Sequence, residues 1–236
     1  MTAESWTQAV RQHVGLGRLL PLGGPRDGAW ITEAAAGAVL RRAAAEVPGV
    51  RVGALRIGLA DPEDVHEPAV PPPPGALPPG PLRVTADFAA TTGEPLPTRA
   101  ARLRSALATT ATERLGLEVA EVDLRVTGLL DEEPEVEPVA PPRPPQSRET
   151  TDPDESRVVA AALSVLGAAH LTGGLGRAVH IEERRDGTAL PHRHARVEVA
   201  VDDSRRTLDV ARQVRAAVGE ALPDHPTVTV LVTAVS

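Results

Sequence analysis

Residues 46–59, EVPGVRVGALRIGL, contain the signal that decides the fold, because a helix ends and a strand begins there within a few residues. The preceding residues 31–46 are rich in alanine and carry apolar side chains at helical spacing, namely Ile31, Ala35, Val39 and Ala43. Pro48 and Gly49 then end this helix, since both residues interrupt helical structure. The apolar positions of residues 52–59 predict a strand immediately after it.

Three further elements follow this strand. Apolar and polar residues alternate over Leu82–Phe88, which predicts a half-buried strand. Apolar residues recur at helical spacing over Thr98–Leu115, and a last strand covers Val122–Val126. We expect the first two strands to pair as an antiparallel hairpin. The last strand should return through the helix and lie parallel to the second.

The same order of elements recurs in the second half of the chain, where VLGA at residues 165–168 takes the place of VPGV at 47–50. The expected elements are a helix (Glu155–Val165), two strands (Ala178–Glu183, Val197–Val201), a helix (Leu208–Leu222) and a strand (Val228–Val232). The sequence thus predicts an α+β protein of two similar small units, an internal repeat. Each unit would be helix-strand-strand-helix-strand, with a three-stranded sheet covered by two helices. The outward positions, expected to face water, are Arg83, Thr85, Asp87, Arg196, Glu198 and Ala200.

Proline-rich stretches set the domain boundaries. Units at 28–130 and 155–236 flank an acidic proline-rich linker at 131–154, and nine prolines lie in a loop at 61–81. Such stretches favour extended, polyproline-like chain, either as stiff spacers or as ligands for a proline-binding partner. Residues 1–27 form a separate amphipathic segment, with apolar residues that include Trp6, Val10, Val14, Leu19 and Leu20. It could pack on the first unit, dock on a partner or touch a membrane surface.

Composition excludes several kinds of chemistry. The 236 residues carry a net charge of −7, contain no cysteine, and all 25 basic residues are arginine, which suggests a GC-rich, actinobacterial source. Without cysteine or lysine there is no thiol nucleophile, zinc-thiolate site, Schiff base or Walker P-loop. The acidic balance is unlike that of most nucleic-acid-binding proteins. With no long apolar run and no signal peptide, we expect a cytoplasmic protein.

The spacing of these elements resembles a known family. The helix before VPGV, the alternating strand, the next helix and the run Leu115-Gly116-Leu117 are followed by Val122-x-Leu124-x-Val126-x-Gly128-Leu129. This order resembles the alkaline shock protein family of bacterial envelope-stress proteins, over about residues 28–130 and more faintly 155–236. The loop at 61–81 departs from the family pattern. The resemblance implies a non-enzymatic, self-associating cytoplasmic protein, held near the membrane by a separate anchor protein, and supplies no catalytic residues.

Three histidines are the candidates for a metal site. His192 and His194 would face the same side of a strand, and His180 lies in or at the end of the preceding one. Imidazoles so placed could bind a divalent cation. The segment PHRHAR (191–196) also fits a solvated turn, and Arg193 and Arg196 would repel a cation.

A glycine-rich loop is the second candidate site, formed by Gly173, Gly174, Gly176 and Arg177. As a phosphate cradle it has the wrong order, because such loops follow a strand and open a helix. It also fits the GxxG pattern of a KH nucleic-acid-binding module, although there a helix follows the loop rather than a strand. The alternative is a flexible turn that requires positive φ.

Together these observations predict a non-enzymatic scaffold or interaction protein linked to envelope stress or cell-wall homeostasis. Its partners would be further copies of itself and a membrane-anchored protein, with no cofactor and no small-molecule substrate. Strand edges would carry the association, or else the helices Ile31–Glu46 and Thr98–Leu115. The interaction residues expected on the strands are Val84, Phe88, Val197 and Val199. The alternative is a KH-like RNA- or DNA-binding protein that uses the glycine loop and the helix arginines, among them Arg99, Arg102, Arg104, Arg205, Arg206, Arg212 and Arg215.

Overall fold

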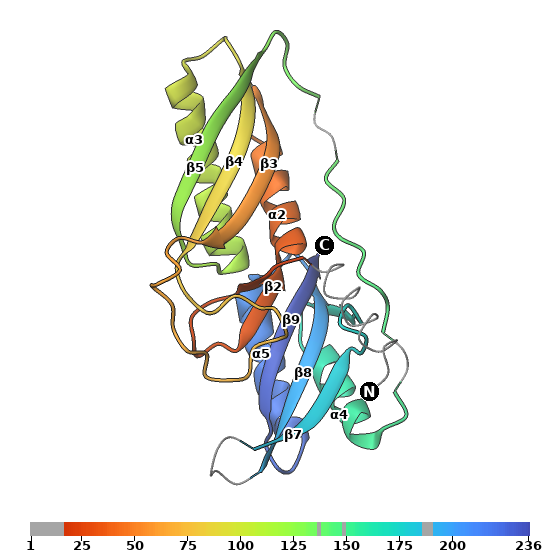
Figure 1. Ribbon diagram of the computed structural model, residues 1–236. Helices are drawn as coiled ribbons and strands as arrows, with labels where there is room; N and C mark the ends of the chain where they lie inside the picture. The colour runs from red at the N-terminus through yellow and green to blue at the C-terminus, as the bar shows by residue number, and fades with distance from the viewer. Residues whose placement is uncertain (1–16, 136–137, 148–149, 186–190) are drawn as a thin grey trace, which may run out of the picture.

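A computed structural model describes residues 17–135, 138–147, 150–185 and 191–236, and the predicted α+β class is confirmed (Figure 1). In chain order the elements are β1 (Leu19–Pro21), β2 (Ala29–Thr32), α2 (Glu33–Ala45), β3 (Val50–Leu59), β4 (Leu82–Thr91), α3 (Leu96–Thr109), the π-helical turn η1 (Thr110–Leu115), β5 (Val119–Leu130), α4 (Pro153–Leu163), β6 (Ala168–Leu171), β7 (Val179–Arg184), β8 (His192–Val201), α5 (Thr207–Ala221) and β9 (Thr227–Val235). The predicted segment 1–27 is described only from Gly17, so Trp6, Val10 and Val14 lie outside the described residues. Leu19 and Leu20 lie in β1 rather than in a helix.

The smaller sheet, sheet B, has the predicted connections. Its strand order is β3-β4-β5, where β3 and β4 are antiparallel and β4 and β5 are parallel. The chain passes from β4 to β5 through α3 and η1. Both α2 and α3 lie on one face of the sheet (Figure 1), and Arg83, Thr85 and Asp87 point out from the other.

The larger sheet, sheet A, differs from the three-stranded sheet expected in the second half. It has six strands in the order β1-β2-β9-β8-β6, with β7 also paired to β8. Strand β2 runs parallel to β9, with Trp30 opposite Leu231. The expected helix start at Ile31 is therefore wrong: Ile31 is a buried strand residue, and α2 begins after Thr32, whose Oγ1 accepts a hydrogen bond from the amide of Ala35.

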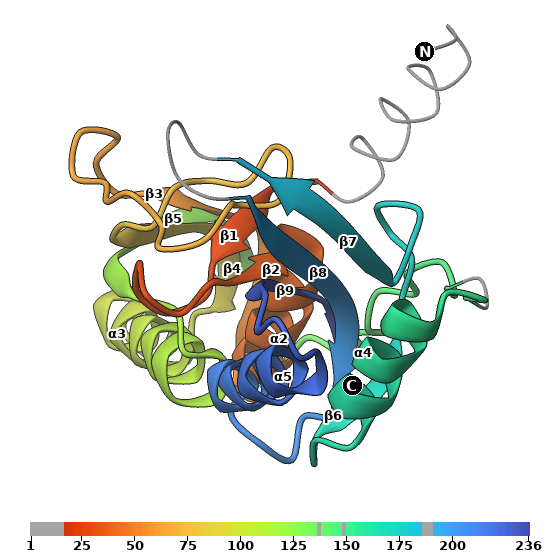
Figure 2. The ribbon, with the colours of Figure 1, turned by 90° about the horizontal axis from the view of Figure 1, so that it is seen from below.

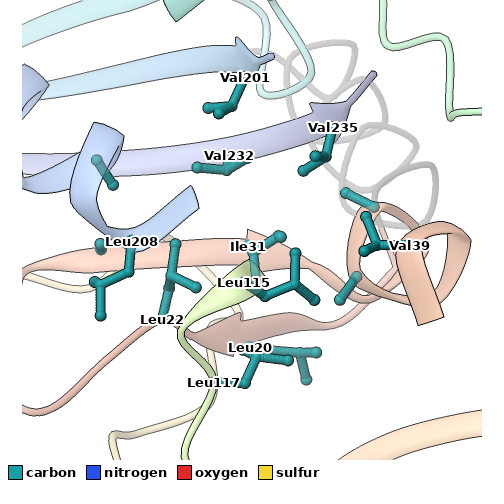
Figure 3. Close-up of a cluster of buried hydrophobic side chains, with 14 of the residues drawn as sticks. Leu20, Leu22, Ile31, Val39, Leu115, Leu117, Val201, Leu208, Val232 and Val235 are labelled. Atoms are coloured by element: carbon teal, nitrogen blue, oxygen red, sulfur yellow. The ribbon is translucent and has the colours of Figure 1, made fainter. Parts of the chain in front are cut away.

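The two sheets share one hydrophobic core. Helix α2 packs against β3 of sheet B and against β9 of sheet A, while α4 and α5 cover one face of sheet A (Figure 2). Figure 3 shows where side chains from both halves meet: Leu20, Leu22, Ile31, Val39, Leu115, Leu117, Val201, Leu208, Val232 and Val235. The core is built almost entirely from aliphatic side chains, since Phe88 is the only aromatic in the main cluster of the described residues.

The proline-rich loop 61–81 folds over the other face of sheet A. The amides of Ala69 and Leu77 donate to the carbonyls of Pro25 and Leu19, at 2.8 and 2.9 Å. The indole of Trp30 donates to the carbonyl of Leu77 at 3.1 Å. Val70 is buried in a small cluster made up of Leu19, Trp30, Val70 and Leu231, with Ala76 and Leu175 packed against it. This loop therefore acts as a cover for the sheet, and not as a spacer.

The acidic linker touches both halves of the molecule. Glu133 accepts a hydrogen bond from the amide of Gly49, next to sheet B. Farther along, the carbonyl of Pro145 accepts from the amide of Gly173 at 2.8 Å, and Gln146 forms an isolated bridge with Thr172 beside β6. The linker thus occupies backbone groups at that edge of sheet A.

The helix stop at residues 47–50 gives a first prediction. Gly49 has a φ of +69°, and a Cβ placed there would lie 1.7 Å from a guanidinium nitrogen of the buried Arg99. Gly49→Ala should therefore lower the free energy of unfolding by about 2 kcal/mol or more, from backbone strain and steric clash. Gly93→Ala is the matched control, because a Cβ there would come no closer than 3.8 Å to the same side chain. Equal midpoints for the two variants in urea denaturation would contradict the strain argument.

Candidate interaction surface

Four side chains predicted to carry association are buried instead. Val84, Val197 and Val199 have no accessible surface, and Phe88 is 1% exposed. Each lies on a strand with neighbours on both sides, on the face that packs against helices. The alternation of apolar residues marked the core face of the strands, so this part of the prediction is wrong for the folded chain. Of the two helices expected as docking faces, α2 is also largely buried, between the two sheets.

Strand β5 presents an open edge. In the described part of the chain β5 pairs with β4 alone, over residues Val119–Leu130. Two of its apolar side chains are exposed, Val126 at 44% and Leu129 at 62%. An unpaired edge with exposed apolar residues is a template for pairing with another strand.

The opposite edge of sheet B, formed by β3, is better protected against pairing with a further strand. Along β3, Arg41 donates to the carbonyl of Gly53 at 2.7 Å, and the amide of Ile57 donates to the carboxylate of Glu33 at 2.9 Å. Arg18 also reaches the carbonyl of Ile57 at 3.4 Å. Side chains therefore occupy backbone groups of β3 that a further strand would need.

On β5 we find one such contact among the described residues. Nε of Arg104 on α3 donates to the carbonyl of Val122 at 3.1 Å. Arg104 is exposed, so it can move aside at small cost. The edge of β5 is thus the more accessible of the two.

Charged side chains cross-link β5 to β4 on the helix-free face. Arg125 forms a bidentate pair with Asp87, both contacts at 2.8 Å, and these hydrogen bonds lower the pKa of the Asp87 carboxyl. Arg83 contacts Glu121 at 2.5 Å and Asp123 at 3.5 Å. Glu121, Asp123 and Arg125 consequently form a charged row along the open edge, in which two acidic side chains are followed by a basic one.

The local geometry of β5 separates its two faces. Val122, Leu124 and Val126 lie opposite the buried Val84, Ala86 and Phe88, so they share the helix side. The pairing is irregular between Val119 and Glu121 and again between Val126 and Gly128. A regular run, Glu121–Val126, lies between these two irregularities.

The predicted histidines share a face but do not form a cation site. In the register of β7 and β8, His192, His194 and His180 lie opposite Arg184, Glu182 and Arg196. His194 is 4% exposed and its Nδ1 lies 2.8 Å from the Thr227 hydroxyl; burial lowers its pKa to about 4. His180 contacts Glu182 at 3.6 Å. Among the described residues no three histidine or carboxylate groups gather closely enough to hold a metal ion.

The glycine loop binds a carboxylate of its own chain. Gly173 and Gly174 are buried, and the amide of Leu175 lies 3.1 Å from both carboxylate oxygens of Glu198, which Gly174 also contacts. Glu198 is completely buried, although its position on an alternating strand predicted a solvated side chain. Leu175 of the glycine loop also packs against the small cluster beneath the proline-rich loop, and burial raises the pKa of Glu198 to about 7.

The rest of the predicted outward row on β8 is also less exposed than expected. Ala200 has no accessible surface, and desolvation lowers the pKa of the largely enclosed Arg196. By contrast, Arg177 of the predicted glycine-loop site is exposed and pairs with Glu155 at 3.4 Å. The alternation of apolar and polar residues along β8 does not reveal the burial of this row, because the covering segments come from distant parts of the sequence.

The helix arginines mostly make contacts within the chain. Their partners are Pro48 for Arg99, Glu94 for Arg102, Val122 for Arg104, Thr112 for Arg206, Asp27 for Arg212, and Arg26 with Val228 for Arg215. The Arg212–Asp27 pair is the tightest of these ion pairs, at 2.7 Å. These contacts use guanidinium donors that nucleic-acid phosphates would require. Together with the Glu198 contact, they give the KH-like alternative no specific support.

A cavity of about 950 Å³ lies between α4, β6 and linker residues 146–147 and 150–151. Its lining includes Val159, Leu171 and the Arg177–Glu155 pair, and Glu155 also accepts a hydrogen bond from Thr150. These two charged groups are thus already engaged with each other or with the linker.

In the portion of the chain described here, no helix has the length and hydrophobicity needed to cross a bilayer.

No protein-family model matches the chain, and no curated protein resembles it significantly in sequence. The resemblance to the alkaline shock protein family therefore stays a prediction. The strongest candidate for a functional surface is the open edge of β5 with its exposed Val126 and Leu129.

Proposed function

We propose that this protein is a non-enzymatic scaffold that associates with copies of itself through the edge of β5. The observation that carries the proposal is the combination of a twelve-residue strand, one edge of which has no partner strand among the described residues, with two exposed apolar side chains, Val126 and Leu129. Burying them against another strand would contribute about 1–2 kcal/mol each. Backbone pairing along the edge would add directional hydrogen bonds.

The contrast between the two edges of sheet B supports this assignment. Protection of β3 by Arg41, Glu33 and Arg18 is the usual way in which a monomeric protein blocks an edge strand. On β5 the exposed apolar residues remain, and Arg104 alone contacts the edge backbone in the described chain. A scaffold requires one edge that pairs and others that do not.

The wider setting of the proposal comes from the family resemblance. In that setting the assembly is cytoplasmic and belongs to an envelope-stress or cell-wall response. A membrane-anchored protein would bring it to the membrane, and the protein itself would carry no membrane segment. The assembly would take no cofactor and no small-molecule substrate.

The test is the molar mass of the purified protein in solution, measured by light scattering from low micromolar concentration to about 100 μM. We expect a mass above that of the 24.6 kDa monomer, rising with concentration. Leu129→Lys should shift the protein toward monomer, because it places a charge at the paired edge. Leu166→Lys is the matched control, since Leu166 is 70% exposed but lies outside sheet B.

Two results would overturn the proposal. One is a wild-type protein that stays monomeric throughout the concentration range. The other is an equal loss of association in both lysine variants, which would move the contact away from β5.

A further inference from the structure

The charge pattern of β5 defines how two copies can meet. For two copies to extend sheet B into one six-stranded sheet, their β5 strands must run antiparallel about a two-fold axis perpendicular to the sheet. Residues directly opposite one another then lie on the same face. The outward row Glu121, Asp123 and Arg125 would therefore face the same row of the second copy.

Within the regular run Glu121–Val126, the two-fold axis can pass beside Val122, Asp123, Leu124 or Arg125, which gives four possible registers. An axis at Val122 places Glu121 opposite the partner's Asp123, which are like charges. An axis at Asp123 or at Arg125 places that residue opposite its own copy. Like charges directly opposite each other destabilise a strand pair.

An axis at Leu124 avoids every one of these conflicts. It places Asp123 opposite the partner's Arg125 and Arg125 opposite the partner's Asp123, which gives two pairs of opposite charge. Asp123 has room for such a contact, because its own neighbour Arg83 lies 3.5 Å away and is held more closely by Glu121. Arg125 contacts Asp87 through Nε and one terminal nitrogen, so its other terminal nitrogen remains for a second carboxylate.

The same register covers the apolar side of the strand. Val126, which is 44% exposed, would lie opposite the partner's Val122, and Leu124 would lie opposite its own copy. Leu129, which is 62% exposed, would lie opposite the partner's Val119. The irregularities beside Ala120 and Thr127 fall at the two ends of the paired run, where they interfere least.

We infer that two copies of the chain pair through antiparallel β5 strands with the two-fold axis at Leu124, joined by reciprocal Asp123–Arg125 contacts. This inference rests on the proposed self-association and specifies its register. The side chain of Arg104 must leave the Val122 carbonyl on pairing, because that carbonyl is then needed by the second strand.

The decisive experiment uses two single charge reversals, Asp123→Arg and Arg125→Asp. Each variant alone places like charges opposite each other twice, so its self-association should weaken at least tenfold. An equimolar mixture of the two should associate again, because every introduced charge then faces an opposite one. Both variants must first show a cooperative thermal transition close to that of the wild type, which separates loss of pairing from loss of fold.

A second measurement tests the position of the two-fold axis directly. The chain has no cysteine, so Leu124→Cys introduces a single thiol beside its own copy at the axis, within disulfide range. Mild oxidation should convert this variant to a covalent dimer. Val119→Cys should not respond, since ten residues of strand, about 33 Å, would separate the two thiols.

The possible results distinguish a wrong register from a wrong proposal of self-association. Recovery of association in the mixture together with cross-linking at Leu124→Cys supports the inference. If the wild type associates but the reversals have no effect, or the mixture stays dissociated, the register is wrong while the scaffold proposal stands. A wild type that remains monomeric overturns both.

Discussion

The Glu198→Gln variant is expected to lose about 2 kcal/mol of stability between pH 6.5 and 4.5, whereas the stability of the wild type should change little over this range. The difference arises because two buried groups on β8, Glu198 and His194, have pKa values displaced in opposite directions. In the wild type their effects on folding cancel over this pH range. The variant retains only one of them.

Glu198 favours the folded state at lower pH. Its pKa is about 7 in the folded protein, because of burial, against an ordinary value of 4.5. Between these two values the folded chain holds a proton that the unfolded chain has released. Stability from this group therefore rises as pH falls from 7 to 4.5 and is lost as pH rises through 7.

His194 acts in the opposite sense. Burial lowers its pKa to about 4 from 6.5, with an opposing effect from Glu182 and smaller contributions from Arg184, Arg196 and His192. Below pH 6.5 the unfolded chain takes up a proton that the folded chain refuses. Stability from this group is therefore lost as pH falls from 6.5 to 4.

Urea denaturation at several pH values between 7.5 and 4.5 measures the effect. Glu63→Gln serves as the control, because Glu63 is an exposed glutamate on the proline-rich loop. The slope of stability against pH is the informative quantity, since it is independent of any constant change caused by the substitution. Parallel curves for wild type and Glu198→Gln would show that the carboxyl of Glu198 does not retain its proton near neutrality.

Trp30→Ala should cost about 3–5 kcal/mol and release the proline-rich loop from sheet A. Trp30 is 1% exposed, packs against Val70 of the loop, and donates its indole hydrogen bond to Leu77. Removing the ring leaves a cavity beneath the loop and removes one of its attachments. The amides of Ala69 and Leu77, which donate to Pro25 and Leu19, should then exchange their hydrogens faster.

Trp30→Phe separates the two contributions of this side chain. It keeps most of the apolar contact and loses the hydrogen bond to Leu77, so a cost nearer 1 kcal/mol is expected. Hydrogen exchange followed by mass spectrometry over residues 66–79, with denaturation in parallel, compares the two variants. If alanine costs no more than phenylalanine, or if loop exchange is unchanged in both, the loop is not held by Trp30.

Sheet B could be predicted from the sequence because its determinants are local. Alternation over Leu82–Phe88 and the helix Thr98–Leu115 specify a strand and its crossover, and the right-handed connection then fixes the parallel return to β5. Sheet A could not be predicted in the same way. Strands β1 and β2 have only three and four residues, and Ile31 happens to continue the helical spacing of α2.

The proposed association surface is a strand edge, as the sequence predicted, but it involves other residues than those expected. Strand edges were the expected site of association, yet the apolar residues chosen for it, such as Phe88, belong to the core. Exposure of Val126 and Leu129 depends on β5 having no second neighbour among the described strands, which only the strand order reveals. The burial of Glu198 likewise depends on segments that are distant in sequence.

The pairing of β2 with β9 has a consequence for how the chain acquires its structure during synthesis. Thr32 and Thr233, joined by a hydrogen bond, are separated by 201 positions, so the first strands of sheet A must wait for almost the whole chain to be made. Sheet B has all its strands between residues 50 and 130 and can begin to form much earlier. Contacts of such long separation slow folding, and they leave apolar strands such as Ala29–Thr32 without their partner in the meantime. Completion of sheet A should therefore be the late, slow event in the maturation of this protein.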